Sequence, residues 1–325
     1  MANRTLVEAV NDALMVALDG DERVMIMGED VGRNGGVFRA TDGLIDRFGP
    51  DRVVDTPLSE AGIIGTAIGL ATYGMRPIAE IQFLGFSYQA FAQLLVQAAR
   101  MRWRSNGRFN CPLVVRAPFG VGVRAPEVHS DALEAHFAHT PGLKVVAPAT
   151  PYDAKGLLLA AIEDPDPVIV MEPLRGYRAG RAEVPEGHYT VPIGPANVAR
   201  EGSDVTIVAW SHMVTVSLAA ADMLAAEGIA AEVIDLRTLA PFDAETIVRS
   251  VQKTGRAVVV HEAPRTSGLG AEIVATINDQ ALLSLEAPVA RVTGYDVPIP
   301  TAMIEDYYLP TPARILEAVR DTLSF

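Results

Sequence analysis

Short apolar runs alternate with longer helix-forming patterns along nearly the whole chain, and this alternation constrains the fold more than any other feature. In the first half the expected strands are Val24–Met27, Pro77–Gln82, Leu113–Arg116, Lys144–Val146 and Val168–Met171. The helical patterns between them are Glu60–Tyr73, Phe86–Arg104 and Pro151–Ile162. Because parallel strands need long crossover connections, the pattern predicts an α/β fold with a mostly parallel sheet flanked by helices.

A second alternating set follows a break rich in Gly, Pro and polar residues. Its expected strands are Val205–Ala209, Ala231–Asp235, Ala257–His261 and Val289–Thr293. Its expected helices are Met213–Ala226, Glu245–Lys253, Ala271–Leu283 and a closing helix that follows Pro310 and runs to about Leu323. We therefore expect two domains, residues 1–185 and 204–325, joined by a linker at 186–203.

The composition excludes several classes of protein. Hydrophobic residues make up 49% of the 325 positions and charged residues 21%, which supports sizeable cores and argues against disorder. The net charge of −13 disfavours nucleic acid and anionic membranes as partners. The single cysteine, Cys111, excludes an internal disulfide and fits a reducing compartment. Met1–Glu8 shows no signal or transit pattern, and no apolar run reaches ~18 residues, so we expect a cytoplasmic protein without membrane spans.

One carboxylate, Glu60, lies where a charge is costly. It follows Ser59, a good N-cap, and begins the run Glu60–Gly74, which is almost wholly apolar and small. We expect this run to be a helix packed on all sides. Burying a carboxylate costs several kcal/mol unless a partner compensates it. That partner could be a cofactor nitrogen, or Glu60 could simply complement the helix dipole, and its position alone leaves both interpretations open.

Several longer runs occur together in a recognisable order. They are Gly28-Glu29-Asp30-Val31-Gly32, Leu58-Ser59-Glu60-Ala61-Gly62, Glu80-Ile81-Gln82-Phe83, His129-Ser130 and Pro151-Tyr152-Asp153-Ala154-Lys155-Gly156-Leu157-Leu158. With Asp235–Leu239 and Lys253–Arg256, they make the chain, from about Leu6 to the C-terminus, resemble the beta subunit of thiamine-diphosphate-dependent 2-oxo acid dehydrogenases. The resemblance implies domains similar to the pyrimidine-binding and C-terminal domains of transketolase.

The resemblance also implies roles for individual residues. Thiamine diphosphate chemistry needs an acid held against the aminopyrimidine ring nitrogen in a dry pocket, and Glu60 matches the family's activating glutamate. Glu29 ends a strand, where α/β folds place ligands, and is expected at the cofactor interface. Phe86 matches an aromatic residue that stacks on the aminopyrimidine. His129, on the long loop 118–141, matches a histidine that assists the reaction with a lipoyl group.

The diphosphate of the cofactor is expected to be held elsewhere. The chain lacks a Gly-Asp-Gly run followed some thirty residues later by an Asn pair, the diphosphate–magnesium pattern of the superfamily. The resemblance therefore implies that an alpha subunit holds the diphosphate and its magnesium. It also implies a monovalent cation, such as potassium, bound by the backbone carbonyls of Leu113, Ala161, Asp164 and Asp166.

These features lead to an expected activity. We expect a pyruvate-type enzyme that carries out oxidative decarboxylation and reductive acylation of a lipoyl group on a partner acyltransferase. The expected partners are two alpha subunits, a second beta subunit, and the binding and lipoyl domains of the acyltransferase. Arg124–Val128 is more similar to pyruvate-type than to branched-chain members.

Three alternatives remain open at this stage. The substrate could be a branched-chain 2-oxo acid or acetoin. The chain could be mainly a scaffold that binds the acyltransferase, although Glu60, Phe86 and His129 together argue against that. A nicotinamide-dependent dehydrogenase is disfavoured, because no G-x-G-x-x-G run follows a strand and Gly62, Gly65 and Gly69 favour close helix packing instead.

Overall fold

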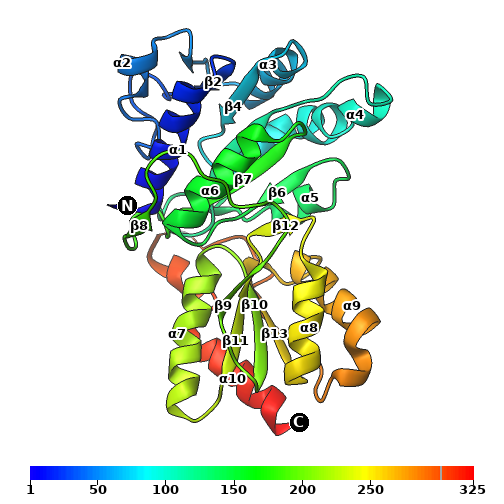
Figure 1. The fold of residues 1–325 in the computed structure, drawn as a ribbon. Helices are drawn as coiled ribbons and strands as arrows, with labels where there is room; N and C mark the ends of the chain where they lie inside the picture. Colours follow the sequence, from blue (N-terminus) through cyan, green and yellow to red (C-terminus); the bar gives the residue numbers. More distant parts are fainter. Residues whose placement is uncertain (301) are drawn as a thin grey trace.

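The first domain is built on a seven-stranded sheet in the order β12-β6-β7-β5-β4-β2-β3 (Figure 1). The computed structural model describes residues 1–300 and 302–325. The strands are β2 (Val24–Gly28), β3 (Val53–Asp55), β4 (Arg76–Glu80), β5 (Val114–Phe119), β6 (Lys144–Val146), β7 (Val168–Pro173) and β12 (Thr238–Ala240). All neighbours pair in parallel except β12, which lies antiparallel to β6. The predicted mostly parallel sheet is thus confirmed.

Helices cover this sheet, and a short ribbon of β1 (Ala2–Arg4) and β8 (Ala182–Val184) lies beside it. The helices are α1 (Leu6–Gly20), α2 (Leu44–Phe48), α3 (Glu60–Thr72), α4 (Met101–Arg104), α5 (Glu134–Ala138) and α6 (Pro151–Glu163). Helix α1, which was not predicted, packs against α6. It begins at a capping box in which Thr5 Oγ1 accepts from the Glu8 amide and the Glu8 carboxylate accepts from the Thr5 amide.

The predicted single helix over 86–104 is wrong. The segment divides into a 3₁₀-helix, η1 (Leu84–Ala90), a π-helix, η2 (Ala92–Ala98), and α4. Gly85 allows the start of η1 to approach another segment closely, because an added Cβ there would collide with the Val128 carbonyl oxygen. The start of η1 is therefore packed directly against η3 (Glu127–Ser130), the turn that carries His129.

Helix α3 is packed on one side only, which corrects the expectation for that run. Its buried face carries Ile63, Ile64 and Ala67, whereas Gly62, Gly65, Thr66 and Gly69 are exposed. The exposed residues are all small and carry no charge. In the sequence alone, such residues are therefore easily taken for buried ones.

The second domain holds a five-stranded sheet in the order β14-β13-β10-β11-β9. Its strands are β9 (Asn197–Arg200), β10 (Val205–Ala209), β11 (Ala231–Asp235), β13 (Ala257–Pro264) and β14 (Ala290–Gly294). Its helices are α7 (His212–Ala226), α8 (Ala244–Thr254), α9 (Leu269–Ala281) and α10 (Pro312–Ser324), with 3₁₀-turns η4 (Leu282–Ser284) and η5 (Ala302–Tyr307). Strand β9 lies within the range expected to be a linker and pairs antiparallel with β11 at the sheet edge.

The two domains are joined by more than the connecting chain. Strand β12 comes from the second half of the sequence and completes the first sheet, as Figure 1 shows at the middle of the molecule. One apolar core also runs across the junction, bringing Leu133 and Phe137 of the first half together with Trp210, Leu239 and Leu269 of the second. The sequence predicted two units, and the shared strand and core make their junction part of the packed interior.

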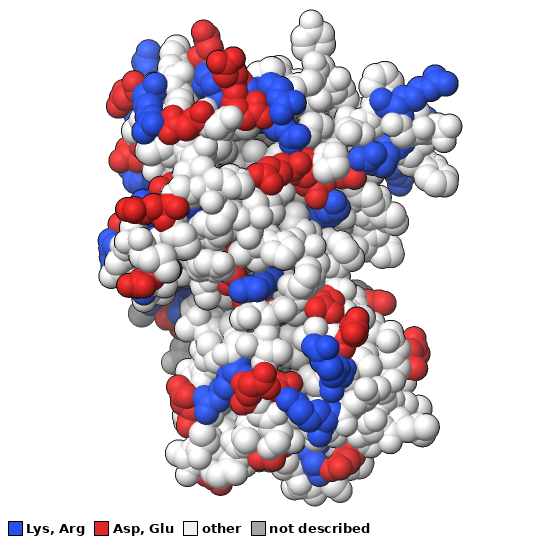
Figure 2. Space-filling model, in the orientation of Figure 1, with Lys and Arg blue, Asp and Glu red and all other residues white. Residues whose placement is uncertain are grey.

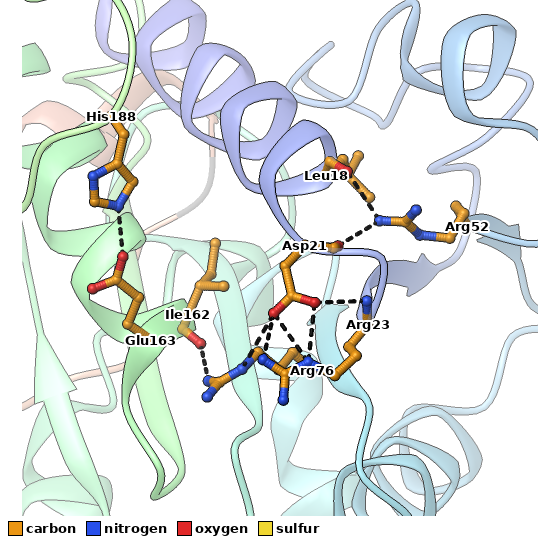
Figure 3. A network of polar contacts seen from close by, with 8 residues as sticks. All are labelled: Leu18, Asp21, Arg23, Arg52, Arg76, Ile162, Glu163 and His188. Carbon is orange, nitrogen blue, oxygen red and sulfur yellow. Dashed lines mark hydrogen bonds and ion pairs between the residues drawn. The ribbon is translucent and has the colours of Figure 1, made fainter.

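The amino ends of the first sheet's strands are closed by arginines (Figure 3). Arg23 Nη2 lies 2.7 Å from Asp21 Oδ2, and Arg76 donates to the Ile162 carbonyl at 2.6 Å. Arg52 donates to the carbonyls of Leu18, Asp21 and Val24. Side-chain hydrogen bonds from Arg23 are the main reason that the pKa of Asp21 is lowered. Arginine side chains thus cover the amino ends of β2, β3 and β4, whereas open α/β sheets place ligands at the opposite, carboxyl edge.

On the face shown in Figure 2, acidic and basic side chains are intermixed. The net charge of −13 is therefore not gathered into one acidic patch on this face. Within the described residues, no helix combines the length and apolar character that crossing a bilayer requires.

Candidate active site

The sequence-predicted site residues gather at the carboxyl edge of the first sheet. Glu29 directly follows β2, and Glu60 begins α3 shortly after β3. Phe86 lies in η1 after β4, and His129 lies in η3 on the loop after β5. Since β2, β3, β4 and β5 are parallel, their carboxyl ends meet at one edge, which is where open α/β sheets place ligands.

Glu60 is buried, with 4% of its surface exposed. Ser59 provides the cap of α3 through its Oγ, which accepts from the Gly62 amide at 3.2 Å. Within the described residues Glu60 Oε2 has no hydrogen-bond partner. Capping therefore does not account for Glu60, and a buried carboxylate oxygen without a partner is rare and costly in proteins. The geometry favours the first of the two interpretations, an acid that awaits a ligand.

Glu29 lies near Glu60 and is half-buried. Burial is the largest cause of the raised pKa of Glu29, and the negative charges of Glu60 and Asp30 raise it further. Two carboxyl groups that repel each other in this way favour a cationic or proton-donating group between them. The pair thus supplies an acidic environment beside a largely apolar helix.

Phe86 and His129 meet in an aromatic cluster with Phe83. The His129 ring lies 4.7 Å from the Phe83 ring and 5.0 Å from the Phe86 ring, centroid to centroid, and both contacts are edge-on. Phe83 is buried, as expected of a core residue, whereas Phe86 and His129 are only partly buried. Phe86 can therefore offer a ring face to a ligand.

The tautomer of His129 follows from one contact. Its Nδ1 lies 3.1 Å from the Pro126 carbonyl oxygen, which can only accept. With Nδ1–H donating to that oxygen, Nε2 remains free to accept or return a proton. This arrangement suits general acid–base catalysis by the His129 ring, because the contact at Nδ1 holds the ring in place and leaves Nε2 available.

The four carbonyl groups expected to bind a monovalent cation lie at the opposite edge of the sheet, at the amino ends of β5 and β7. The Leu113 carbonyl accepts from the Val168 amide at 3.0 Å, and the Ala161 carbonyl accepts from the Asp164 amide at 3.3 Å. The side chains of Asp164 and Asp166 bind Lys144 and Arg102. A cation bound here would lie at the edge of the sheet opposite to Glu60.

In the part of the chain that the structure describes, no group of three His, Cys, Asp or Glu side chains is placed to hold a metal ion. Cys111 is buried, and burial raises the pKa of its thiol to about 12. A buried thiol with a raised pKa is a weak nucleophile.

A buried polar network beneath the site was not predicted. Arg116 binds Glu80 and Glu172, and the Tyr177 hydroxyl donates to Glu172. The sequence carried a signal for it, because β5 and β7 each hold one charged residue within an apolar run and β4 ends on Glu80 after the apolar residues 77–79. Pairing those three charges required the strand order β7-β5-β4, which the sequence pattern does not give.

Comparisons with known proteins agree with this architecture. Residues 2–179 match the family model of the transketolase pyrimidine-binding domain, and residues 194–315 match that of the transketolase C-terminal domain. A solved "split gene transketolase, inactive beta4 tetramer" superposes with a TM-score of 0.82 at 26% identity, covering 99% of both chains. A transketolase mutant from Pichia stipitis superposes with a TM-score of 0.74 at 17% identity, covering 100% of this chain and 46% of the other, and shows the fold alone.

Two relatives are similar over their whole length. The "pyruvate dehydrogenase E1 component subunit beta" of Bacillus subtilis strain 168 is 53% identical, and that of Staphylococcus aureus strain Mu50 is 52% identical. Both alignments cover 100% of this chain and 100% of the relative. The two transketolase-like domains and this full-length similarity show that the chain belongs to the family of pyruvate dehydrogenase E1 component beta subunits.

Proposed function

We propose that this chain supplies the pyrimidine half of a thiamine diphosphate site in a pyruvate dehydrogenase. The observation that carries the proposal is Glu60, a buried carboxylate whose Oε2 has no partner in the described residues. Glu60 would hold a proton against the aminopyrimidine ring nitrogen, and Phe86 would pack on that ring. When bound, thiamine diphosphate supplies the electron sink for decarboxylation of a 2-oxo acid.

The neighbouring groups fit this role. Glu29 places a second carboxyl beside Glu60, so that the pair favours a bound group that donates hydrogen bonds or carries positive charge. The apolar face of α3 excludes water from one side of Glu60. His129, with Nε2 free, would exchange a proton with the acyl acceptor, a lipoyl group on a partner acyltransferase.

We propose that the remaining parts of the site come from an alpha subunit. The described residues contain no side-chain cluster for magnesium and the sequence contains no diphosphate motif, so the alpha subunit would hold the diphosphate with its magnesium. The exposed small-residue face of α3 lies next to Glu60 and supports a subunit contact there. A second beta subunit and the acyltransferase's binding domain would use the second domain, and a potassium ion would stabilise the carbonyl site at Leu113.

We propose the domain limits 1–185 and 204–325; two observations support them, and a third argues for an earlier start of the second domain. The first family model ends at residue 179, shortly before the proposed limit at 185, and the second begins at residue 194, within the range between the domains. The β1–β8 ribbon closes the first domain at Val184. Strand β9 shows that part of the connecting range 186–203 belongs to the second sheet.

Replacing Glu60 tests the proposed function directly. Glu60→Gln keeps the size of the side chain but removes the transferable proton, so decarboxylation by the assembled enzyme should fall by on the order of 10²–10⁴. The assay is turnover of pyruvate with an artificial electron acceptor, with size-exclusion chromatography to confirm assembly. Glu163→Gln, which changes an exposed glutamate paired with His188, is the matched control and should retain activity.

Near-normal turnover by assembled Glu60→Gln enzyme would show that Glu60 only complements the helix. Running the same assay on branched 2-oxo acids and acetoin distinguishes the pyruvate proposal from the alternative substrates. Activity on pyruvate at least equal to that on the others is the expected result.

A further inference from the structure

Four buried polar side chains lie on β4, β5 and β7 and on the turn that follows β7, in the sheet whose carboxyl edge carries the candidate active site. Arg116 donates from Nε to Glu172 Oε1 at 2.9 Å and from Nη2 to Glu172 Oε2 at 2.6 Å. Its Nη1 donates to Glu80, and the Tyr177 hydroxyl donates to Glu172. Each of the four residues is at most 5% exposed. We call these residues the strand-end network.

Burying the charged groups of the strand-end network costs free energy of desolvation. The network sets two carboxylates against one guanidinium, and burial and the charge of Glu172 raise the pKa of Glu80 although Arg116 lowers it. Apolar residues of similar volume often stabilise a protein as well as a buried ion pair does. Unlike apolar packing, such a network has fixed geometry. The bidentate Arg116–Glu172 contact and the third bond to Glu80 hold the three strands in fixed positions relative to one another.

Aromatic contacts connect this network to His129. The Tyr177 ring lies 5.5 Å from the Phe38 ring, and Phe38 lies 5.4 Å from Phe83. Phe83 in turn lies 5.4 Å from Phe86 and 4.7 Å from His129. An unbroken series of ring contacts therefore runs from the buried hydroxyl of Tyr177 to the imidazole of His129.

Backbone contacts lead from the strand-end network to the same site. The Arg116 carbonyl accepts from the Ile81 amide at 3.1 Å, two residues before Phe83. Gly28, which precedes Glu29, packs so closely on the Glu80 carbonyl oxygen that an added Cβ would lie 2.8 Å from it. The network thus underlies the segments that carry Glu29 and Phe83.

We propose that Glu80, Arg116, Glu172 and Tyr177 are positioning residues, which hold the Phe83–Phe86–His129 cluster in the orientation needed for acyl transfer. The proposal rests on the function proposed above for His129. It assigns no chemistry to the network itself, because none of its four side chains is exposed to a ligand. Its loss would rotate or loosen the ring of His129 without removing any group from the site.

Two conservative variants in the heterotetramer with the alpha subunit test the proposal. Tyr177→Phe removes only the hydroxyl that binds Glu172, and Glu80→Gln removes one charge with little change of shape. Tyr189→Phe is the matched control, because it removes a hydroxyl that donates to the Tyr152 carbonyl at 2.8 Å, away from the site. The readouts are the imidazole NMR signals of His129 in labelled protein, lipoyl acylation, artificial-acceptor decarboxylation and the melting temperature.

We expect both network variants to shift the His129 signals and its tautomer balance. Lipoyl acylation should fall by about 10-fold, within the loss that a small misplacement of a catalytic group can cause, with decarboxylation much less affected. The control should change neither. His129 signals that match wild type in both variants, whatever happens to the melting temperature, would reduce the network to a purely structural role. Shifted His129 signals in a protein without 2-oxo acid activity would instead uphold the positioning and contradict the proposed function.

Discussion

At the scale of single residues, the proposed function divides two tasks between two side chains. Glu60 is enclosed at the start of α3 with an unpartnered oxygen, which suits holding a proton within the site. His129 lies on a loop, partly exposed, with Nδ1 against a carbonyl and Nε2 free, which suits exchange with a group that arrives from outside. The two residues should therefore affect different steps when they are replaced.

His129→Ala should damage lipoyl acylation far more than decarboxylation. Loss of a general acid–base group should lower the acylation rate by on the order of 10²–10⁴. Decarboxylation followed with an artificial acceptor should stay near the wild-type rate, because that assay bypasses the lipoyl group. His188→Ala, at an exposed histidine paired with Glu163, is the control. Equal losses in the two assays would argue against a selective role for His129.

At the scale of secondary structure elements, α3 has two distinct faces. Its buried face contributes Ile63, Ile64 and Ala67 to the core, and the opposite face presents glycines and a threonine to solvent. Glycine in a helix interior costs about 0.5–1 kcal/mol of stability relative to alanine. The glycines on this face therefore lower the stability of the helix. We propose that close approach by another subunit explains this face, and the proposal can be tested at one position.

Gly69→Leu should leave the chain folded but hinder its assembly with the alpha subunit. A Cβ added at Gly69 meets no atom within 4 Å, so the isolated chain can accept the side chain and should melt at an unchanged or slightly higher temperature. Sedimentation velocity of the mixed subunits should show less heterotetramer than wild type. Ala225→Leu, on the exposed side of α7, is the control for added surface hydrophobicity. Normal assembly of Gly69→Leu would place the subunit contact elsewhere.

At the scale of the whole molecule, the domain junction contains acids held away from water. Burial raises the pKa of Glu134 to about 7 and that of Glu262 to about 8, and the charge of Glu134 adds to the shift of Glu262. Glu305 also faces Glu262, and the Val121 amide and Arg175 partly offset the repulsion. The two domains are therefore packed around groups that prefer to be protonated.

Stability should accordingly fall as the pH rises from about 6.5 to 8.5. Glu134 and Glu262 have folded pKa values above the ordinary 4.5, as does Asp235 at about 7 against 3.8, so the folded state binds more protons than the unfolded state in this range. Burial lowers the pKa of His212 and His261 from the ordinary 6.5 to about 4, an opposite effect that is half complete at pH 6.5 and fades by about pH 7.5, so the three acids still dominate the slope. Calorimetric melting temperatures across the range measure the slope.

Glu262→Gln should flatten that slope, because the amide does not ionise. Glu286→Gln, at a side chain that is 60% exposed, should leave it unchanged and serves as the control. A melting temperature of the wild-type chain that stays constant or rises from pH 6.5 to 8.5 would contradict the assignment of buried, protonated acids to the junction.

The sequence by itself determined the features that depend on local pattern. Strands such as Val205–Ala209 appear where continuous apolar runs predicted them, because burial on both faces of a parallel strand requires such runs. The sequence also singled out Glu60 as a carboxylate at the start of an apolar helix, and the structure buries it there. The long motif runs carried the resemblance to the family, which the full-length relatives then confirmed.

Tertiary structure alone decided what depends on which segments become neighbours. The pairing of Arg116 with Glu80 and Glu172 needs the strand order β7-β5-β4, and the contact of Phe86 with His129 needs the loop after β5 to fold over η1. The exposed face of α3 is a second example. Small apolar residues occur both in cores and on exposed surfaces, so the sequence alone does not show which of the two this face is. The periodicity of a sequence predicts which face of its own helix or strand a residue occupies. It does not predict contacts between elements, because these depend on the order of the strands in the sheet.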